Sequence, residues 1–266
     1  KRIKKKSDAA CIAICDNIIP HEKRRLDKQL TKRFFTFMDS FIVLSKKVEE
    51  ELLSFVPEAK YKYCPHPVYS IFGEAPSNNV AKSELKISTK KVLMFFGLIR
   101  EYKGLDILIN AMEKIKDELE DYTLLIVGEC YGDEKKYRDL ITNAGINDHV
   151  QSHFKFVPDD EVGTYFSAAD VVVLPYRTAS QSGIVQIAYH YNTPVIVSNV
   201  GGLPEIVDEG NTGYCVDPTA DAFAKAIKIF YEKDNISEMS SNVSHYKSRF
   251  SWDAMVKTIE DLANVR

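Results

Sequence analysis

The stretch FFGLIREYKG, residues 95–104, decides the fold class of this chain. It completes the apolar run KVLMFFG, residues 91–97, which is typical of a strand buried on both faces of a parallel sheet. Apolar residues then recur at helical spacing through LDILINAMEKIK, residues 105–116. Arg100 and Lys103 therefore fall between the end of a strand and the start of a helix, where open α/β sheets bind their ligands.

Two cations beside a helix N-terminus indicate an anion site, most simply one for phosphate. The same residues also fit an exposed basic turn, and this segment alone does not decide between the two interpretations.

Strand and helix patterns alternate from residue 90 onward, which predicts a doubly wound parallel sheet with crossover helices. The predicted strands are 91–97, 123–129, 153–157, 170–176, 193–199 and 213–216, and the helices are 103–117, 133–145, 159–168, 182–192, 202–209 and 219–232. The front of the chain is also predicted as α/β, with strands at 9–16, 40–45 and 60–67 and helices at 21–38 and 46–56, the second capped by Ser45. Residues 74–88 lack periodicity and collect Pro, Ser and Asn, so they are predicted to form a linker, and 251–264 to form a final helix.

Composition excludes several classes of protein. With 266 residues, 45% of them hydrophobic, the chain can build a substantial core, and its net charge of -3 does not favour a general nucleic-acid role. Five scattered cysteines without a Cys-x-x-Cys pair indicate reduced thiols in a cytoplasmic protein. No run is long enough to predict a transmembrane span. The basic KRIKKK at 1–6 and KRR at 23–25 fit a solvated face or attraction to an anionic membrane or acceptor.

Candidate site residues follow strand after strand at the predicted carboxyl ends, where loops converge on one crevice. These residues are Gly97, Arg100 and Lys103, then Gly128, Phe156 and Val157, then Ser180, Gln181, Ser182 and Gly183, and finally Glu205. In SQSG, a serine can cap the following helix and the glycine lets a ligand approach the backbone. His21, directly after a predicted strand, suits contact with a sugar or proton transfer, although a solvated histidine is the commoner case.

Motifs that the sequence lacks exclude further classes of enzyme. The chain has no Gly-x-Gly-x-x-Gly after a strand, no Walker loop, no Asp-x-Asp and no Gly-x-Ser-x-Gly. A nicotinamide oxidoreductase, suggested by fold alone, is therefore disfavoured. Cations and helix N-termini would have to neutralise phosphates in place of a metal ion.

Several stretches, in this order, resemble the retaining glycosyltransferases of family 4 (group 1), which have the GT-B fold of two facing Rossmann-like domains. The stretches are Gly97 with Lys103–Gly104, LLIVGE, FVPDDEV, ADVVVLPY and TPVIVSNVGGLPEIVDEGNTGYCVDP. CDNIIPHE, residues 15–22, is similar to the end of the family's N-terminal domain, so we expect most of that domain to be absent. The expected domains are then 1–72 (N-terminal remnant), 73–89 (linker), 90–248 (nucleotide-sugar domain) and 249–266 (a helix packing back toward the N-terminal domain).

The resemblance implies roles for individual residues. Arg100 and Lys103 would hold the donor diphosphate, with Gly97 allowing close backbone approach. The loop at Phe156 and Val157 would contact the nucleobase. By the same resemblance, Gly183 and its neighbours would bind phosphate, and His21 would face the transferred sugar.

One family feature is replaced here. The Glu-x7-Glu pattern of the family aligns with Ala179 and Ile187, which cannot accept a hydrogen bond from a hydroxyl. Gln181 and Gln186 lie nearby in the sequence and are the candidate substitutes.

We therefore expect a metal-independent, cofactor-free hexosyltransferase that moves a sugar from a nucleotide donor, UDP-sugar favoured over GDP-sugar, to an acceptor hydroxyl with retention. The expected acceptor is a saccharide or lipid-linked saccharide of the cell envelope, reached from the cytoplasm with peripheral membrane contact. The main alternative is a non-catalytic nucleotide-sugar binder or partner subunit. A GT-B-type sugar-nucleotide epimerase would need carboxylates facing the sugar, and the sequence offers no convincing pair.

Overall fold

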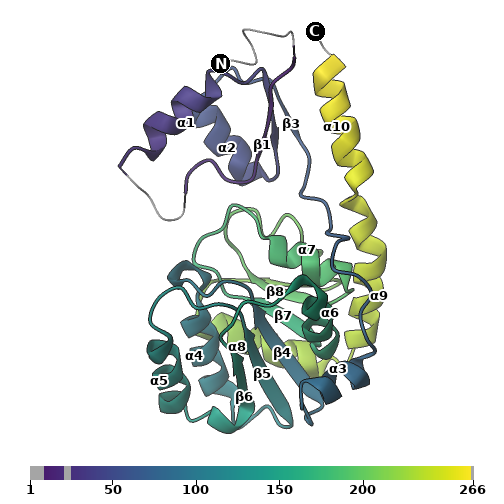
Figure 1. Cartoon of the computed structure of the whole chain (residues 1–266). Helices are drawn as coiled ribbons and strands as arrows, with labels where there is room; N and C mark the ends of the chain where they lie inside the picture. Colours follow the sequence, from purple (N-terminus) through teal and green to yellow (C-terminus); the bar gives the residue numbers. More distant parts are fainter. Residues whose placement is uncertain (1–8, 21–24, 265–266) are drawn as a thin grey trace.

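The computed structural model describes residues 9–20 and 25–264, which form two α/β lobes (Figure 1). The smaller lobe has a parallel sheet of β1 (Ile12–Cys15), β2 (Ser40–Val43) and β3 (Tyr61–Tyr63), in that order. Helices α1 (Asp27–Phe35) and α2 (Lys46–Phe55) cover one face of this sheet, and α10 (Trp252–Asn264) packs on the other. The alternation along β2 explains this, since Phe41 and Val43 face α1 and α2 while Ile42 faces α10.

The larger lobe has six parallel strands in the order β6-β5-β4-β7-β8-β9. Their bounds are β4 (Lys91–Phe96), β5 (Tyr122–Val127), β6 (Val150–His153), β7 (Val171–Leu174), β8 (Val195–Ser198) and β9 (Gly213–Val216). The chain builds outward from β4 in one direction and then from β7 in the other. The strand order therefore reverses between β4 and β7, which is where doubly wound sheets open a crevice.

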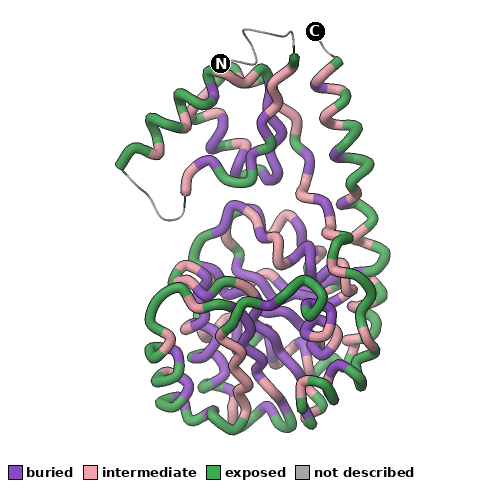
Figure 2. Tube along the Cα trace, in the orientation of Figure 1, coloured by how far each residue is buried: buried purple, intermediate pink, exposed green. Residues whose placement is uncertain are grey.

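Helices cover both faces of the larger sheet, as the sequence predicted. One face carries α4 (Leu105–Ile115), α5 (Glu134–Ala144) and α8 (Ala220–Glu232), and the other carries α3 (Asn78–Glu84), α6 (Asp159–Ala168), α7 (Gly183–His190) and α9 (Ile236–Tyr246). Short 3-10 turns lie at Glu101–Lys103, Asn147–His149 and Lys247–Arg249. Figure 2 shows the buried trace concentrated in the strands between these layers.

Two connections join the lobes and lie side by side (Figure 1). One leads from β3 to α3 and the other from α9 to α10. The two connections are hydrogen bonded to each other, since the Val68 N–H donates to the Phe250 carbonyl at 2.9 Å, and the Trp252 side-chain indole N–H donates to the Val68 carbonyl at 3.0 Å. The lobes are therefore held together by a paired hinge as well as by the contacts described below.

The predicted linker at 74–88 contains α3, so its helix was missed. Its sequence has no apolar period, but Ala81 is fully buried against the larger core and the Asn78 side-chain amide donates to the Ser167 carbonyl at 2.8 Å. Tertiary contacts with α6 thus stabilise a helix that local pattern does not predict. Helix α9 was missed as well.

Two other predicted elements were placed wrongly. Residues 202–209 are a series of turns, because successive N–H groups donate to carbonyls three residues back and the Asp208 N–H is taken by the Thr212 hydroxyl at 2.9 Å. The third strand is 150–153, not 153–157. This β6 is an edge strand, so the polar sequence VQSH is compatible with it.

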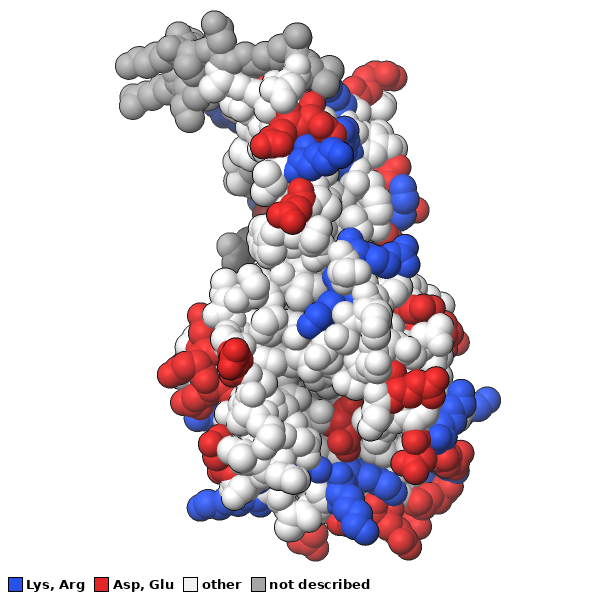
Figure 3. All heavy atoms as spheres, turned by 90° about the vertical axis from the view of Figure 1, so that its right-hand side faces the viewer, with Lys and Arg blue, Asp and Glu red and all other residues white. Residues whose placement is uncertain are grey.

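Among the described residues, no helix is both long and apolar enough to cross a membrane. On the face shown in Figure 3, acidic and basic side chains are intermingled over both lobes. The basic residues 1–6 and 23–24 lie outside the part of the chain that the structure describes.

Candidate functional site

A cavity of about 220 Å³ lies between the lobes, above the point where the strand order reverses. The larger lobe contributes Tyr102 and Lys103 from the turn after β4, and Tyr176 with residues 179–184 from the segment after β7. The smaller lobe contributes Asp16 and Asn17, which follow β1. The carboxyl ends of strands from two facing sheets therefore meet at one cavity.

Lys103 is the cation of this cavity. Its side chain is buried, with the residue only 9% exposed, and burial lowers the pKa of its ammonium below the ordinary value. The Nζ atom lies 5.4 Å from the centroid of the Tyr176 ring, and no carboxylate of the described chain pairs with it. A buried positive charge with no carboxylate partner among the described residues favours an anionic ligand.

The turn that carries Lys103 is fixed to the loop after β7. Gly104 adopts a left-handed conformation, with φ of 66°, and a Cβ there would lie 2.0 Å from the Pro175 carbonyl oxygen. The Arg177 N–H donates to the Tyr102 carbonyl at 2.7 Å. The Arg177 guanidinium also forms two hydrogen bonds to the Asp106 carboxylate, at 2.9 and 2.5 Å.

The Arg177–Asp106 pair changes the pKa of the Asp106 carboxyl group. Burial works to raise the pKa of Asp106, but the hydrogen bond and charge of Arg177 outweigh it, so the pKa is lowered. Asp106 therefore stays ionised, and the clamp that sets the position of Lys103 persists at neutral pH.

Gly97 leaves room for Lys103, and Gly128 leaves room for the Gly97 backbone. Gly97 has φ of 105°, and a Cβ there would lie 3.1 Å from Ile184 Cδ1 and 3.2 Å from Lys103 Nζ. A Cβ at Gly128 would lie 2.0 Å from the Gly97 carbonyl oxygen. In the structure the Lys103 ammonium lies beside Gly97, and Gly128 packs against the Gly97 backbone.

Arg100 is not among the cavity-lining residues. Its guanidinium carbon lies 4.6 Å from the centroid of the Tyr131 ring. The structure therefore separates the two predicted cations: Lys103 lines the cavity and Arg100 lies against an exposed aromatic side chain.

The SQSG segment lines the cavity as predicted. Ser182 caps α7, because its Oγ accepts a hydrogen bond from the Ile184 N–H at 3.2 Å. Ser180 does not cap the helix, and its carbonyl instead accepts a hydrogen bond from the Ser45 hydroxyl at 2.8 Å. Gly183 begins α7, which directs its N-terminus toward the cavity. The positive end of a helix and the Lys103 ammonium thus lie at one cavity.

Gln181 crosses the cavity from one lobe to the other. Its side-chain amide N–H donates to the Asp16 carboxylate, whereas its carbonyl oxygen is buried with no hydrogen-bond partner in the described structure. Tyr176 also lines the cavity, and burial raises the pKa of its phenol to about 12, so it remains a neutral hydrogen-bond donor.

Sequence reasoning missed Asp16, Asn17 and Tyr102 as lining residues. The polar pair Asp16–Asn17 directly follows β1, so the rule of strand carboxyl ends could have found it. Tyr102 lies in the turn between Arg100 and Lys103, and the sequence pattern indicated a role only for these two cations.

Other predicted site residues lie elsewhere. Gln186 is fully buried in α7 and does not line the cavity, and both polar atoms of its side chain lack a partner among the described residues. Phe156 lies beyond the end of β6 and is 68% exposed, whereas Val157 is part of the larger core. His21 falls outside the described residues.

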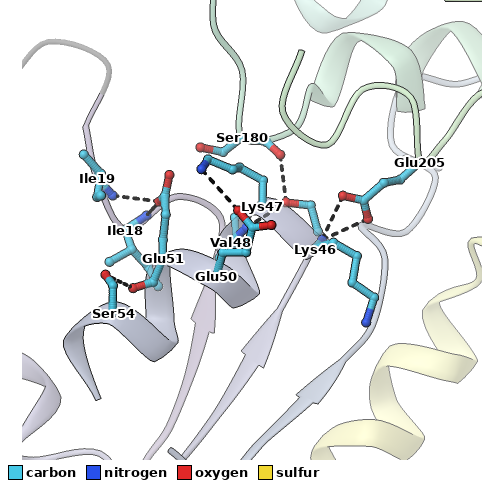
Figure 4. Close-up of polar contacts among 11 residues, drawn as sticks. Ile18, Ile19, Lys46, Lys47, Val48, Glu50, Glu51, Ser54, Ser180 and Glu205 are labelled. Carbon is cyan, nitrogen blue, oxygen red and sulfur yellow. Dashed lines mark hydrogen bonds and ion pairs between the residues drawn. The ribbon is translucent and has the colours of Figure 1, made fainter. Parts of the chain in front are cut away.

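Glu205 was predicted at a helix start beside the donor. The structure places it in the turns of 201–206, where its carboxylate binds the Lys46 N–H of the smaller lobe (Figure 4). It does not line the cavity. In the part of the chain that is described, no three His, Cys, Asp or Glu side chains gather in a way that could hold a metal ion.

Comparison with known proteins is consistent with this geometry. Residues 77–250 match the family model "Glycosyl transferases group 1". D-inositol 3-phosphate glycosyltransferase of Corynebacterium efficiens is 26% identical over 257 residues, covering 91% of this chain and 59% of that protein. A putative glycosyltransferase, YtcC of Bacillus subtilis, is 29% identical over 203 residues, covering 73% of this chain and 49% of its own length. The chain thus spans about half the length of these relatives.

Solved structures of similar fold include sucrose-phosphate synthase from Thermosynechococcus elongatus, with a TM-score of 0.80 and 20% identity over 98% of this chain and 69% of that one. Another is Anabaena Alr3699/HepE in complex with UDP and glucose, with a TM-score of 0.80 and 18% identity over 96% of this chain and 72% of that one. At these identities the likeness establishes the fold, which is the GT-B type predicted from the sequence.

Proposed function

The chain belongs to the group 1 glycosyltransferases, and from that premise we propose that it transfers a sugar from a nucleotide-sugar donor to an acceptor hydroxyl. The observation that carries the proposal is the buried ammonium of Lys103, which has no carboxylate partner in the described part of the chain and lines an interlobe cavity where the strand order reverses. Such a cation is costly for the empty protein and becomes favourable when a diphosphate binds.

In the proposed reaction, negative charge builds on the leaving diphosphate as the bond to the sugar breaks. Lys103 and the N-terminus of α7 would stabilise that charge, with the Tyr176 hydroxyl as a neutral donor beside them. Asp16 and Asn17, from the facing lobe, would lie on the sugar side. Closure of the lobes would exclude water and so limit hydrolysis.

We also propose that the reaction retains the anomeric configuration and needs no metal ion. Among the described lining residues, Asp16 is the one carboxylate, and Gln181 already binds it. With so few carboxylates at the cavity, a mechanism fits in which the departing diphosphate accepts the proton of the acceptor hydroxyl. For the metal, the support is that the Lys103 ammonium lines the cavity.

For the donor, we propose UDP-sugar over GDP-sugar, with no separate cofactor. The support is fold similarity to a protein whose structure contains UDP. Arg100 remains a proposed diphosphate ligand on movement of its turn, and the exposed ring of Phe156 a proposed contact for the base. We also propose that His21 faces the transferred sugar, because it follows Asp16 and Asn17 in the chain.

We further propose a family 4 enzyme acting on a saccharide or lipid-linked saccharide of the cell envelope, in the cytoplasm and at the membrane surface. The domain division at 1–72, 73–89, 90–248 and 249–266 is part of this proposal. We propose that further strands of the N-terminal domain pack beside β1. The support is an exposed apolar face at this sheet edge, formed by Ile14, Leu30 and Phe34.

The alternative, a binder without turnover, is favoured by one observation. Ala179 and Ile187 occupy the positions of the two family glutamates, and both are buried apolar side chains. The buried amide of Gln186 does not reach the cavity in their place.

The experiment is to incubate the chain with UDP-, GDP- and ADP-sugars and measure release of the nucleoside diphosphate. The proposal predicts release from one nucleotide class, abolished in Lys103→Met. Binding of a nucleoside diphosphate without release, with saccharide acceptors present, would favour the alternative instead.

A further inference from the structure

Glu205 joins the two lobes through the first turn of α2 (Figure 4). Both of its carboxylate oxygens accept a hydrogen bond from the Lys46 N–H, at 2.8 and 2.9 Å, and Oε2 also accepts one from the Tyr63 hydroxyl at 3.2 Å. The first N–H groups of a helix have no partner within the helix, and its N-terminus favours negative charge. A carboxylate of the larger lobe thus caps a helix of the smaller one.

Ser45 makes a second contact at the same place. Its hydroxyl accepts a hydrogen bond from the Val48 N–H at 3.1 Å, which caps α2, and donates one to the Ser180 carbonyl at 2.8 Å. Gly202 makes room for this contact, because a Cβ there would lie 2.5 Å from Ser45 Cβ and 2.4 Å from the Ser180 oxygen. Ser180 itself lines the cavity, so the start of α2 is tied to the cavity wall.

The middle of α2 holds the opposite wall. Glu51 is buried, and its Oε2 accepts hydrogen bonds from the Ile18 N–H at 3.3 Å and the Ile19 N–H at 3.0 Å (Figure 4). These residues directly follow Asp16 and Asn17, which line the cavity. One helix therefore connects the strand end of the smaller lobe with the loops of the larger lobe.

We propose that Glu205 is a positioning residue that holds the two walls of the donor cavity together through α2. This inference rests on the proposed function for the identity of the ligand. Glu205 does not line the cavity, so in this proposal it acts by fixing Asp16 and Asn17 opposite residues 180–183. Without its carboxylate, the lobes separate more readily, donor affinity falls, and water reaches the bound donor.

The chain offers a matched control. Glu209, four residues further on, also binds a backbone N–H, because its Oε2 accepts a hydrogen bond from the Cys215 N–H at 2.7 Å. That contact lies within the larger lobe. Glu205→Ala and Glu209→Ala therefore remove the same kind of hydrogen bond, but only the first removes one between the lobes.

Two readouts separate positioning from stability. Amide hydrogen exchange of the segment at the start of α2 should accelerate roughly tenfold in Glu205→Ala, the scale of a lost helix cap, and stay unchanged in Glu209→Ala. UDP affinity should fall by a similar factor in Glu205→Ala alone. Glu205→Gln keeps one acceptor oxygen and should restore part of both effects. Thermal unfolding checks that each variant is folded.

Unchanged exchange at α2 in Glu205→Ala would overturn the proposal, as would faster exchange with unchanged UDP affinity. If Glu209→Ala changed exchange and UDP affinity as much as Glu205→Ala does, Glu205 would contribute only to general stability. If the unmodified chain binds no nucleoside diphosphate, the proposed function fails, and the exchange measurement, which needs no ligand, still decides whether the Glu205 carboxylate protects the start of α2.

Discussion

Replacing Lys103 by methionine tests the phosphate site because it should change two properties in opposite directions. In the ligand-free protein the ammonium is buried with no paired carboxylate in the described structure. Replacing a buried ion pair by apolar residues of similar volume is often neutral or stabilising by about 1–4 kcal/mol, and a buried charge without a paired carboxylate has less to offset its desolvation. We expect the lower end, about 1 kcal/mol, because the Tyr176 ring partly compensates the charge. That corresponds to a melting temperature higher by about 2 °C at this size.

With ligand, the same substitution should be harmful. Losing one preorganised donor at a developing negative charge costs roughly 10²–10³-fold in kcat, or about 2.7–4 kcal/mol. Lys103→Met should therefore lose most of the UDP-induced thermal shift and most of the nucleoside-diphosphate release. Differential scanning fluorimetry and the release assay measure the two halves of the prediction on the same samples.

Lys136 is the matched control for this experiment. Its Nζ lies 5.6 Å from the centroid of the Tyr137 ring, close to the 5.4 Å of Lys103 over Tyr176, but it is half-exposed, lies 3.8 Å from the Glu101 carboxylate and does not line the cavity. Lys136→Met should leave UDP binding unchanged. The reasoning is refuted if Lys103→Met binds UDP as well as the unmodified chain does, or if both variants lose binding equally.

The stability of the ligand-free protein and its affinity for UDP should also change with pH in opposite directions. Burial lowers the pKa of Lys103 below 10.5, so between the folded and ordinary pKa values the unfolded chain binds more protons. Stability of the ligand-free protein therefore gains from this group as pH rises through that window. UDP affinity falls over the same window, because the cation is lost. Titration calorimetry should show this fall in UDP affinity below pH 10.5. In Lys103→Met, UDP affinity should not fall over this window.

Two further substitutions test the supports of the site. Gly97→Ala puts a Cβ at φ of 105° and 3.2 Å from Lys103 Nζ, and should lower the free energy of unfolding by about 1–3 kcal/mol and weaken UDP binding, measured by thermal unfolding with and without UDP. Asp106→Asn should cost no more than about 1 kcal/mol, since the Arg177 and Asp106 side chains are 39% and 22% exposed. Because the pKa of Asp106 is lowered, this contribution is present at neutral pH and lost as pH falls through the folded pKa; a double-mutant cycle with Arg177→Met isolates it.

The parallel sheet could be predicted because its strands are continuous apolar runs separated by helical periods. Helix α6 and strand β9 have the bounds that the sequence indicated, and Ser45 caps α2 as predicted. Local pattern failed where tertiary contacts decide the structure. Helix α3 forms because it packs on α6, and the polar strand β6 is tolerated because it lies at the sheet edge.

The candidate site was predictable in part for the same reason. Lys103 and the 180–183 segment follow strands that the sequence located, and parallel strands bring such ends together. Glu205 was misjudged because its partner, Lys46, lies 159 residues away in the other lobe. Gln186 was chosen by spacing along the chain, whereas the helix buries it away from the cavity. Contacts between lobes leave no local signal in one sequence.

The central claim is that the cavity binds a nucleoside diphosphate, and thermal unfolding of this chain with UDP, GDP, ADP or NAD tests it most directly. A ligand at about 100 times its Kd adds roughly 2.7 kcal/mol of stability, which is a shift on the order of 5 °C at this size. The account predicts such a shift with one nucleoside diphosphate, UDP before GDP, and its loss in Lys103→Met. A shift with none of the diphosphates, or one that Lys103→Met retains in full, would contradict it.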